Sequence, residues 1–184
     1  SELEEVLERV KDLLKKLKEH SDRVLEESKE SIDRVRKHTE EVLRTARELI
    51  ERLDEMRKRT SDKKDLKDLV EKVRKTVEDL LRENEELLRR VNDRNRKLIE
   101  RNRDLLRKVA TTVDRLIKEL DKRSRTEEVK DVAREIRRRL DELRKDSERV
   151  AEEIRRLNKK LRDESRKAIK EIEELLRRVT KKVE

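Results

Sequence analysis

The side chains in this sequence that could do chemistry are two histidines and a set of asparagines and serines. His20 and His38 are separated by the same interval as Asn84 and Asn102, and as Ser147 and Ser165. A histidine beside a serine could form a nucleophile and its base, and two histidines could hold a metal ion. Because the shared interval makes five turns of a helix with about 3.6 residues per turn, the two members of each pair point the same way.

Neither of these chemistries fits the spacing. The two histidines would lie about 27 Å apart along one helix, so they cannot share an ion. A His–Ser pair needs an open pocket, an orienting acid and an oxyanion hole, which a continuous helix without glycine does not supply. The chain has no cysteine, so thiol chemistry and disulfides are absent as well. We therefore expect no catalytic residue, no metal and no cofactor.

Three very long helices are predicted to position these side chains. The 184 residues include no glycine or proline, and the apolar residues recur at alternating steps of three and four, the spacing of an α-helix. The pattern predicts helices over about 2–59, 63–122 and 127–183. Loops of about three residues make neighbouring helices antiparallel. The predicted fold is all-α, an up-down-up three-helix bundle that forms a single domain over residues 1–184.

Polar residues at the predicted helix starts supply candidate N-caps, because their side chains can accept hydrogen bonds from free backbone amides. The candidates are Ser1 for the first helix, Ser61 or Asp62 for the second, and Ser124 or Thr126 for the third.

The apolar pattern also has an 18-residue repeat, for example at Val6–Leu7, Val24–Leu25 and Val42–Leu43. A strict repeat of seven would wind the helices into a left-handed coiled coil, whereas an 18-residue repeat over five turns matches a straight helix. The repeat therefore predicts nearly straight helices, although local sections look heptad-like.

The repeat places polar side chains in core positions, and the antiparallel register then groups them. His20 should face Asn102, which should face Ser147, while His38, Asn84 and Ser165 form a second layer. A middle layer is predicted from Ser28, Ser31, Asn95 and Asn158, with Asn92 at its rim. A buried polar group without a partner costs about 1–3 kcal/mol, so these layers would penalise slipped or reordered helices.

The surface is predicted to be highly charged, since 57% of the residues are charged and the net charge is +9. Acidic and basic residues at i and i+4 should support the exposed faces. Such pairs occur at Glu5–Arg9, Glu48–Arg52, Glu135–Arg139, Glu152–Arg156 and Glu173–Arg177.

The excess positive charge raises the question of a polyanionic partner. Clusters at Arg137–Arg139, Arg155–Arg156 and Arg177–Arg178 suggest a basic stripe on the third helix. The chain has no aromatic residue to stack on bases, so weak, non-specific polyanion binding is the most that we expect, without specific nucleic-acid recognition. No apolar run is long enough to span a membrane, and no targeting signal is recognised, so the localisation is left open.

With these idealised helices, short loops and His–Asn–Ser layers, the chain resembles computationally designed helical bundles whose cores carry buried hydrogen-bond networks. The resemblance implies a structural scaffold without natural activity, cofactor or ligand. Some members of that family are assembly components or pH-responsive modules, so an assembly or pH-responsive module using the histidine layers is the alternative. No partner is expected. We expect a monomer, and a homo-oligomer or a helix-swapped dimer is the other possible state.

Overall fold

The computed structural model describes residues 2–184, and in this range the chain forms three α-helices and no strand. They are α1 (Glu2–Arg59), α2 (Lys63–Arg123) and α3 (Glu127–Val183). The fold is thus the predicted three-helix bundle. The proposed cap at Ser1 lies outside the described residues.

Side chains at two of the candidate positions cap α2 and α3. The Oδ1 atom of Asp62 accepts a hydrogen bond from the backbone amide of Lys64 at 3.0 Å. The hydroxyl oxygen of Thr126 accepts one from the amide of Val129 at 3.4 Å. Each bond satisfies an amide that has no partner within its own helix. Of the alternatives that the sequence left open, Asp62 and Thr126 are therefore the caps.

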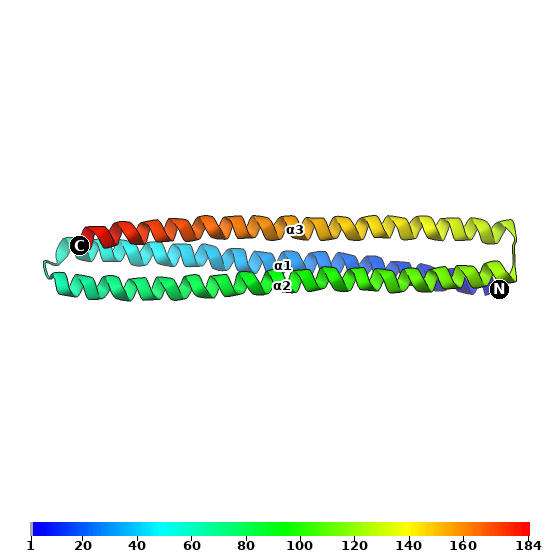
Figure 1. Ribbon diagram of the computed structural model, residues 1–184, viewed down its shortest axis with the longest axis horizontal. Coiled ribbons are helices and arrows are strands. Elements are labelled where there is room, and N and C mark those ends of the chain that lie inside the picture. Colours follow the sequence, from blue (N-terminus) through cyan, green and yellow to red (C-terminus); the bar gives the residue numbers. More distant parts are fainter. Residues whose placement is uncertain (1) are drawn as a thin grey trace. The chain divides into compact units, whose positions relative to one another are not determined.

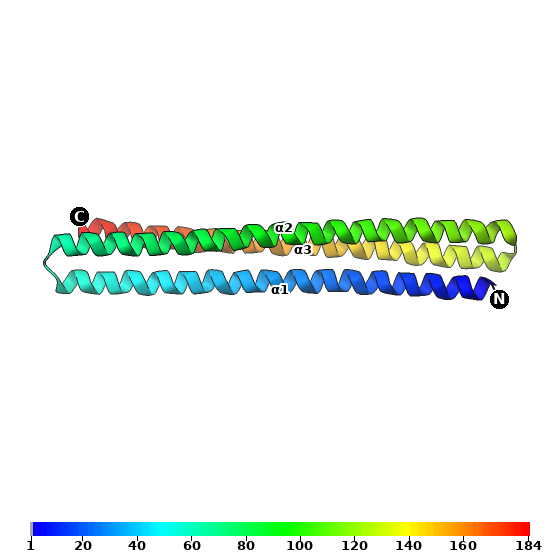
Figure 2. The same cartoon turned by 90° about the horizontal axis from the view of Figure 1, so that it is seen from below.

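The chain divides into two compact units, and each unit contains a segment of every helix. The first unit comprises Ser1–Lys29 and Arg94–Arg156, and the second comprises Glu30–Asp93 and Leu157–Glu184. Within each unit, segments of α1, α2 and α3 lie side by side, with α2 antiparallel to the other two (Figures 1 and 2). Each unit can therefore bury an apolar stripe from all three helices.

The first unit has two apolar clusters, which lie on either side of one polar layer along the helices. On α1, Leu17 belongs to one cluster and Val24 to the other, and His20 lies between them in the sequence. The larger cluster consists of Val10, Leu14, Leu17, Val109, Ala110, Val113, Ile117, Ile136 and Leu140, and the smaller of Val24, Ile99, Val150, Ala151 and Ile154.

The second unit is organised in the same way. On α1, Val35 and Val42 belong to different clusters, and His38 lies between them. The smaller cluster consists of Ile32, Val35 and Leu161. The larger consists of Val42, Ala46, Ile50, Leu53, Leu66, Val70, Val73, Val77, Ile172, Val179 and Val183. The 18-residue repeat of the sequence thus appears as an alternation of apolar clusters and polar positions.

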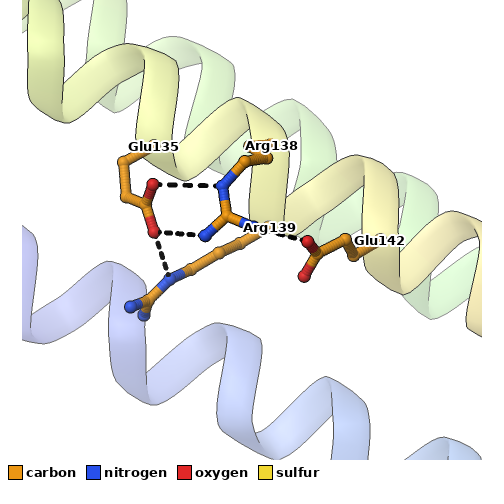
Figure 3. Close-up of polar contacts among 4 residues, drawn as sticks. All are labelled: Glu135, Arg138, Arg139 and Glu142. Carbon is orange, nitrogen blue, oxygen red and sulfur yellow. Dashed lines mark hydrogen bonds and ion pairs between the residues drawn. The ribbon is translucent and has the colours of Figure 1, made fainter.

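Ion pairs on the surface form mainly between neighbours on the same helix. Among the expected pairs, Arg139 bonds Glu135 at 3.1 Å, but Arg156 pairs with Glu153 rather than with Glu152, at 2.6 Å. Figure 3 shows the densest group, in which Glu135 accepts from two arginines on α3. The hydrogen bond from Arg138 is the main reason that the pKa of Glu135 lies below its usual 4.5. This contribution to stability is therefore present above about pH 4.5 and is lost as the pH falls through the lowered pKa.

We expect the substitution Leu161→Ala to lower the free energy of unfolding by about 2–5 kcal/mol, because it removes a fully buried side chain and leaves a cavity. Chemical denaturation followed by circular dichroism measures this change. The control is Met56→Ala, at a side chain that is 47% exposed, which should change stability by no more than about 0.5 kcal/mol. Equal effects of the two substitutions would contradict the described core.

Candidate functional site

A single asparagine on α2 joins all three helices in the polar layer of the first unit. Its carbonyl oxygen, Asn102 Oδ1, lies 2.8 Å from Nδ1 of His20 and 3.2 Å from the hydroxyl of Ser21, both on α1. Its amide nitrogen donates to the hydroxyl of Ser147 on α3 at 3.0 Å and to that of Ser21 at 3.1 Å. Asn102, Ser21 and Ser147 are buried, and His20 is half-buried.

The second unit repeats this arrangement around Asn84. Its Oδ1 atom lies 3.0 Å from Nδ1 of His38 and accepts from the hydroxyl of Thr39 at 2.9 Å. Its amide nitrogen donates to the hydroxyl of Ser165 at 3.1 Å. The side chain of His38 is 23% exposed, and its Nε2 lies 3.8 Å from the exposed carboxylate of Glu83. The equivalent position in the first unit, one repeat further along α2, is Arg101, so the two layers share their buried part and differ at the rim.

The geometry of the layers defines which ring nitrogen carries the proton. An amide carbonyl oxygen only accepts, so a hydrogen bond between it and Nδ1 requires a proton on Nδ1. In the neutral ring Nε2 then has no proton, and a second proton is added there. Because both forms keep the Nδ1–H donor, protonation of either histidine leaves its bond to asparagine in place.

The predicted middle-layer residues are divided between the two units. Ser28 and Asn95 belong to the first unit, and both are fully buried. Ser31 and Asn158 belong to the second, where Ser31 is buried and Asn158 is half-buried. Ser31, Asn95 and Asn158 each have an interaction partner. The hydroxyl of Ser28 has no hydrogen-bond partner among the described residues.

Two members of the layers were missed by the sequence analysis, namely Ser21 and Thr39. Each directly follows a histidine, and the two are one repeat apart, like the other members. That spacing could have identified them. A buried stripe two residues wide on α1 accommodates both the histidine and the hydroxyl residue that follows it.

Hydrogen bonding within the layers does not form a nucleophile–base pair. In the first unit, His20 and Ser147 both bond to Asn102, which lies between them. Asn84 takes the same place between His38 and Ser165 in the second. Across residues 2–184, no group of three or more His, Cys, Asp or Glu side chains is placed to hold a metal ion. No helix within this range is long and apolar enough to cross a membrane. The arrangement is a buried hydrogen-bond network.

Comparison with known proteins supports the fold assignment. A solved structure described as "Computationally designed three helix bundle" is similar to this chain, with a TM-score of 0.59 and 19% sequence identity. The similarity covers 99% of this chain and 95% of that one. No protein-family model matches the sequence, and no curated protein matches it. At this level of identity, the likeness shows a shared three-helix fold.

We expect both imidazoles to carry their proton on Nδ1 at pH 7.5 and to keep the bond to asparagine after acidification to pH 5. Ring nitrogen chemical shifts from NMR report the protonated atom, and circular dichroism reports the helices over the same range. A ring protonated on Nε2 alone at pH 7.5 would mean that the asparagine amide is turned end for end. Loss of helix by pH 5 would contradict the tolerance of the layers to protonation.

Two fully buried serines should respond in opposite ways to replacement by alanine. Ser28→Ala removes a hydroxyl without a partner, so the free energy of unfolding should stay constant or rise by about 1 kcal/mol. Ser165→Ala removes the acceptor for the buried amide of Asn84, so stability should fall by about 1–3 kcal/mol. Urea denaturation of the two variants measures both changes, and a larger loss for Ser28→Ala would contradict the assignment.

Proposed function

We propose that this chain is a designed structural scaffold without natural biochemical activity, and that its polar layers specify helix register and topology. The observation that carries the proposal is that Asn102 bonds to both α1 and α3, and that Asn84 repeats this. The fold that the chain shares with a computationally designed three-helix bundle also supports it.

A slip of one 18-residue repeat shows why two layers restrict the register. In the hairpin of α1 and α2, such a slip could bring His20 opposite Asn84. It would then place His38 opposite Leu66 and move Asn102 beyond the polar positions of α1. Each buried polar group left without a partner costs about 1–3 kcal/mol. The apolar repeat alone would tolerate the same slip, so the discrimination comes from the asparagines.

The proposal includes a single domain and a monomer. All three helices run without interruption through both units, so we expect the units to unfold together. Among the described residues, the large hydrophobic side chain that is exposed is Met56. A bundle without a contiguous apolar patch has little surface with which to associate with another copy.

The pH-responsive alternative has weaker support. A pH-responsive layer must lose hydrogen bonds when histidine gains a proton, but Nδ1 of His20 and of His38 remains a donor in both states. The other ring nitrogen of His38, Nε2, lies 3.8 Å from the Glu83 carboxylate at the rim of the layer, outside the bond to Asn84. The hydrogen bonds of these layers would therefore hold the helices in the same register over a range of pH.

Replacing both layers by apolar side chains tests the proposed role. The variant carries His20→Leu, Ser21→Ala, Asn102→Leu, Ser147→Ala, His38→Leu, Thr39→Val, Asn84→Leu and Ser165→Ala. We expect it to stay helical with a Tm no lower than that of the parent, since buried polar groups add little net stability. It should lose its unique state, seen as several amide signals per residue by NMR or as species above the 22.5 kDa mass of the monomer by light scattering.

The matched control replaces the layer of one unit only. If one helix slipped along another by one repeat, the polar residues of the remaining layer would still lose their partners. This variant should therefore keep one set of NMR signals and the monomer mass. If the variant without either layer also kept a single monomeric state, the layers would not be what specifies the fold.

A further inference from the structure

A groove between α1 and α3 in the first unit carries an excess of positive charge. Its floor includes the apolar side chains of Leu14 and Leu143. Its charged lining consists of Lys11, Lys15 and Lys18 on α1, and Arg139, Glu142, Asp146 and Arg149 on α3. Five cationic side chains thus share the groove with two carboxylates.

Both carboxylates are already engaged with cations. Asp146 bonds the ammonium of Lys18 at 2.9 Å, and Glu142 bonds Arg138 at 2.5 Å. Lys11, Lys15 and Arg149 make no ion pair with a carboxylate of the described chain. The groove therefore retains cations whose charge no neighbouring acid neutralises directly.

Arg139 adds a further donor from the α3 side. It bonds Glu135 through Nε at 3.1 Å, while its side chain reaches away from α3 toward α1 (Figure 3). Arg138 donates to both oxygens of Glu135, at 3.1 Å and 2.6 Å, and also bonds Glu142. Figure 3 thus shows Arg138 bonded to two acids, whereas Arg139, which also lines the groove, is bonded to Glu135 alone.

Several other arginines on the surface are engaged by acids, unlike Lys11 and Lys15 of this groove. Within the predicted stripe on α3, Arg138, Arg156 and Arg178 each bond a glutamate of their own helix. In a second groove, between α2 and α3, the arginines are paired as well: Arg103 with Glu148, Arg107 with Asp104, and Arg144 with Asp141. The α1–α3 groove is the better candidate for an anionic ligand.

We propose that the α1–α3 groove binds a linear chain of phosphate groups, with inorganic polyphosphate as the ligand. Lys11, Lys15 and Lys18 follow one another at steps of four and three residues, which place their side chains along one face of α1. Arg149 and Arg139 line the opposite wall, so an extended anion is contacted from both helices. The chain has no aromatic residue to serve as a platform for bases, so we expect the groove to contact the phosphates.

The test measures the affinity of fluorescently labelled polyphosphate at several NaCl concentrations by anisotropy. The variant Lys11→Gln, Lys15→Gln, Arg149→Gln should bind more weakly. Its plot of log K against log salt concentration should be shallower by about three, since each lost phosphate contact removes about one unit of slope. Circular dichroism verifies that the variant remains folded.

The matched control is Arg103→Gln, Arg107→Gln, Arg144→Gln, which removes the same net charge from the paired arginines of the α2–α3 groove. Its slope should change by less than about one unit. An equal loss in both variants, or no binding by the parent at low salt, would overturn the proposal. Single-stranded DNA at the same phosphate concentration should bind no more tightly than polyphosphate, and tighter binding of DNA would overturn the assignment of the ligand.

Discussion

A buried amide is favourable only when its hydrogen-bonding groups are satisfied, and in each unit one asparagine meets this requirement by bonding to both neighbouring helices. An asparagine on α2 presents an acceptor to α1 and a donor to α3. Apolar contacts between leucine, isoleucine and valine are non-directional and supply most of the free energy of burial. They discriminate poorly between similar registers. In the proposed function the asparagine layers select the register, because a hydrogen bond is lost when its partner moves by a single helical turn.

The sequence was sufficient to predict the helices because its composition, its apolar spacing and the positions of its polar residues all indicate the same three helices. Glycine and proline are absent, the apolar spacing is helical throughout, and the polar residues that interrupt it occur at the loops and in the layers. The pairing of His20 with Asn102 followed from loop position alone, since a hairpin fixes which residues face each other. Consistency of this kind makes long helices simpler to predict than their ends.

What the sequence left open depends on side-chain geometry. Ser61 and Asp62 are adjacent and both are good capping residues, so only the hydrogen bond from the Lys64 amide identifies Asp62 as the cap. Arg156 pairs with Glu153 instead of Glu152 because neighbours at i+3 and i+4 lie at similar distances, and the long side chain can reach either. Ser21 and Thr39 share the 18-residue spacing of the other layer members, but that spacing does not show which of two adjacent polar residues bonds to the asparagine, and in the structure both do. The two units, likewise, have no counterpart in composition, since all three helices continue through the division.

Both asparagines lie on α2, and this position bears on which helices can pair when several bundles of this kind are present together. In each layer α1 contributes a histidine and a hydroxyl, and α3 contributes a serine hydroxyl. One asparagine on α2 bonds to all of them. If the layers set the register as proposed, the positions of the two asparagines on α2 determine which α1 and α3 sequences can pair with it. Moving the two asparagines along α2, together with their partners on α1 and α3, would specify a different pairing of helices with the same apolar core. A set of such bundles could share nearly all of their core residues and still exclude one another's helices.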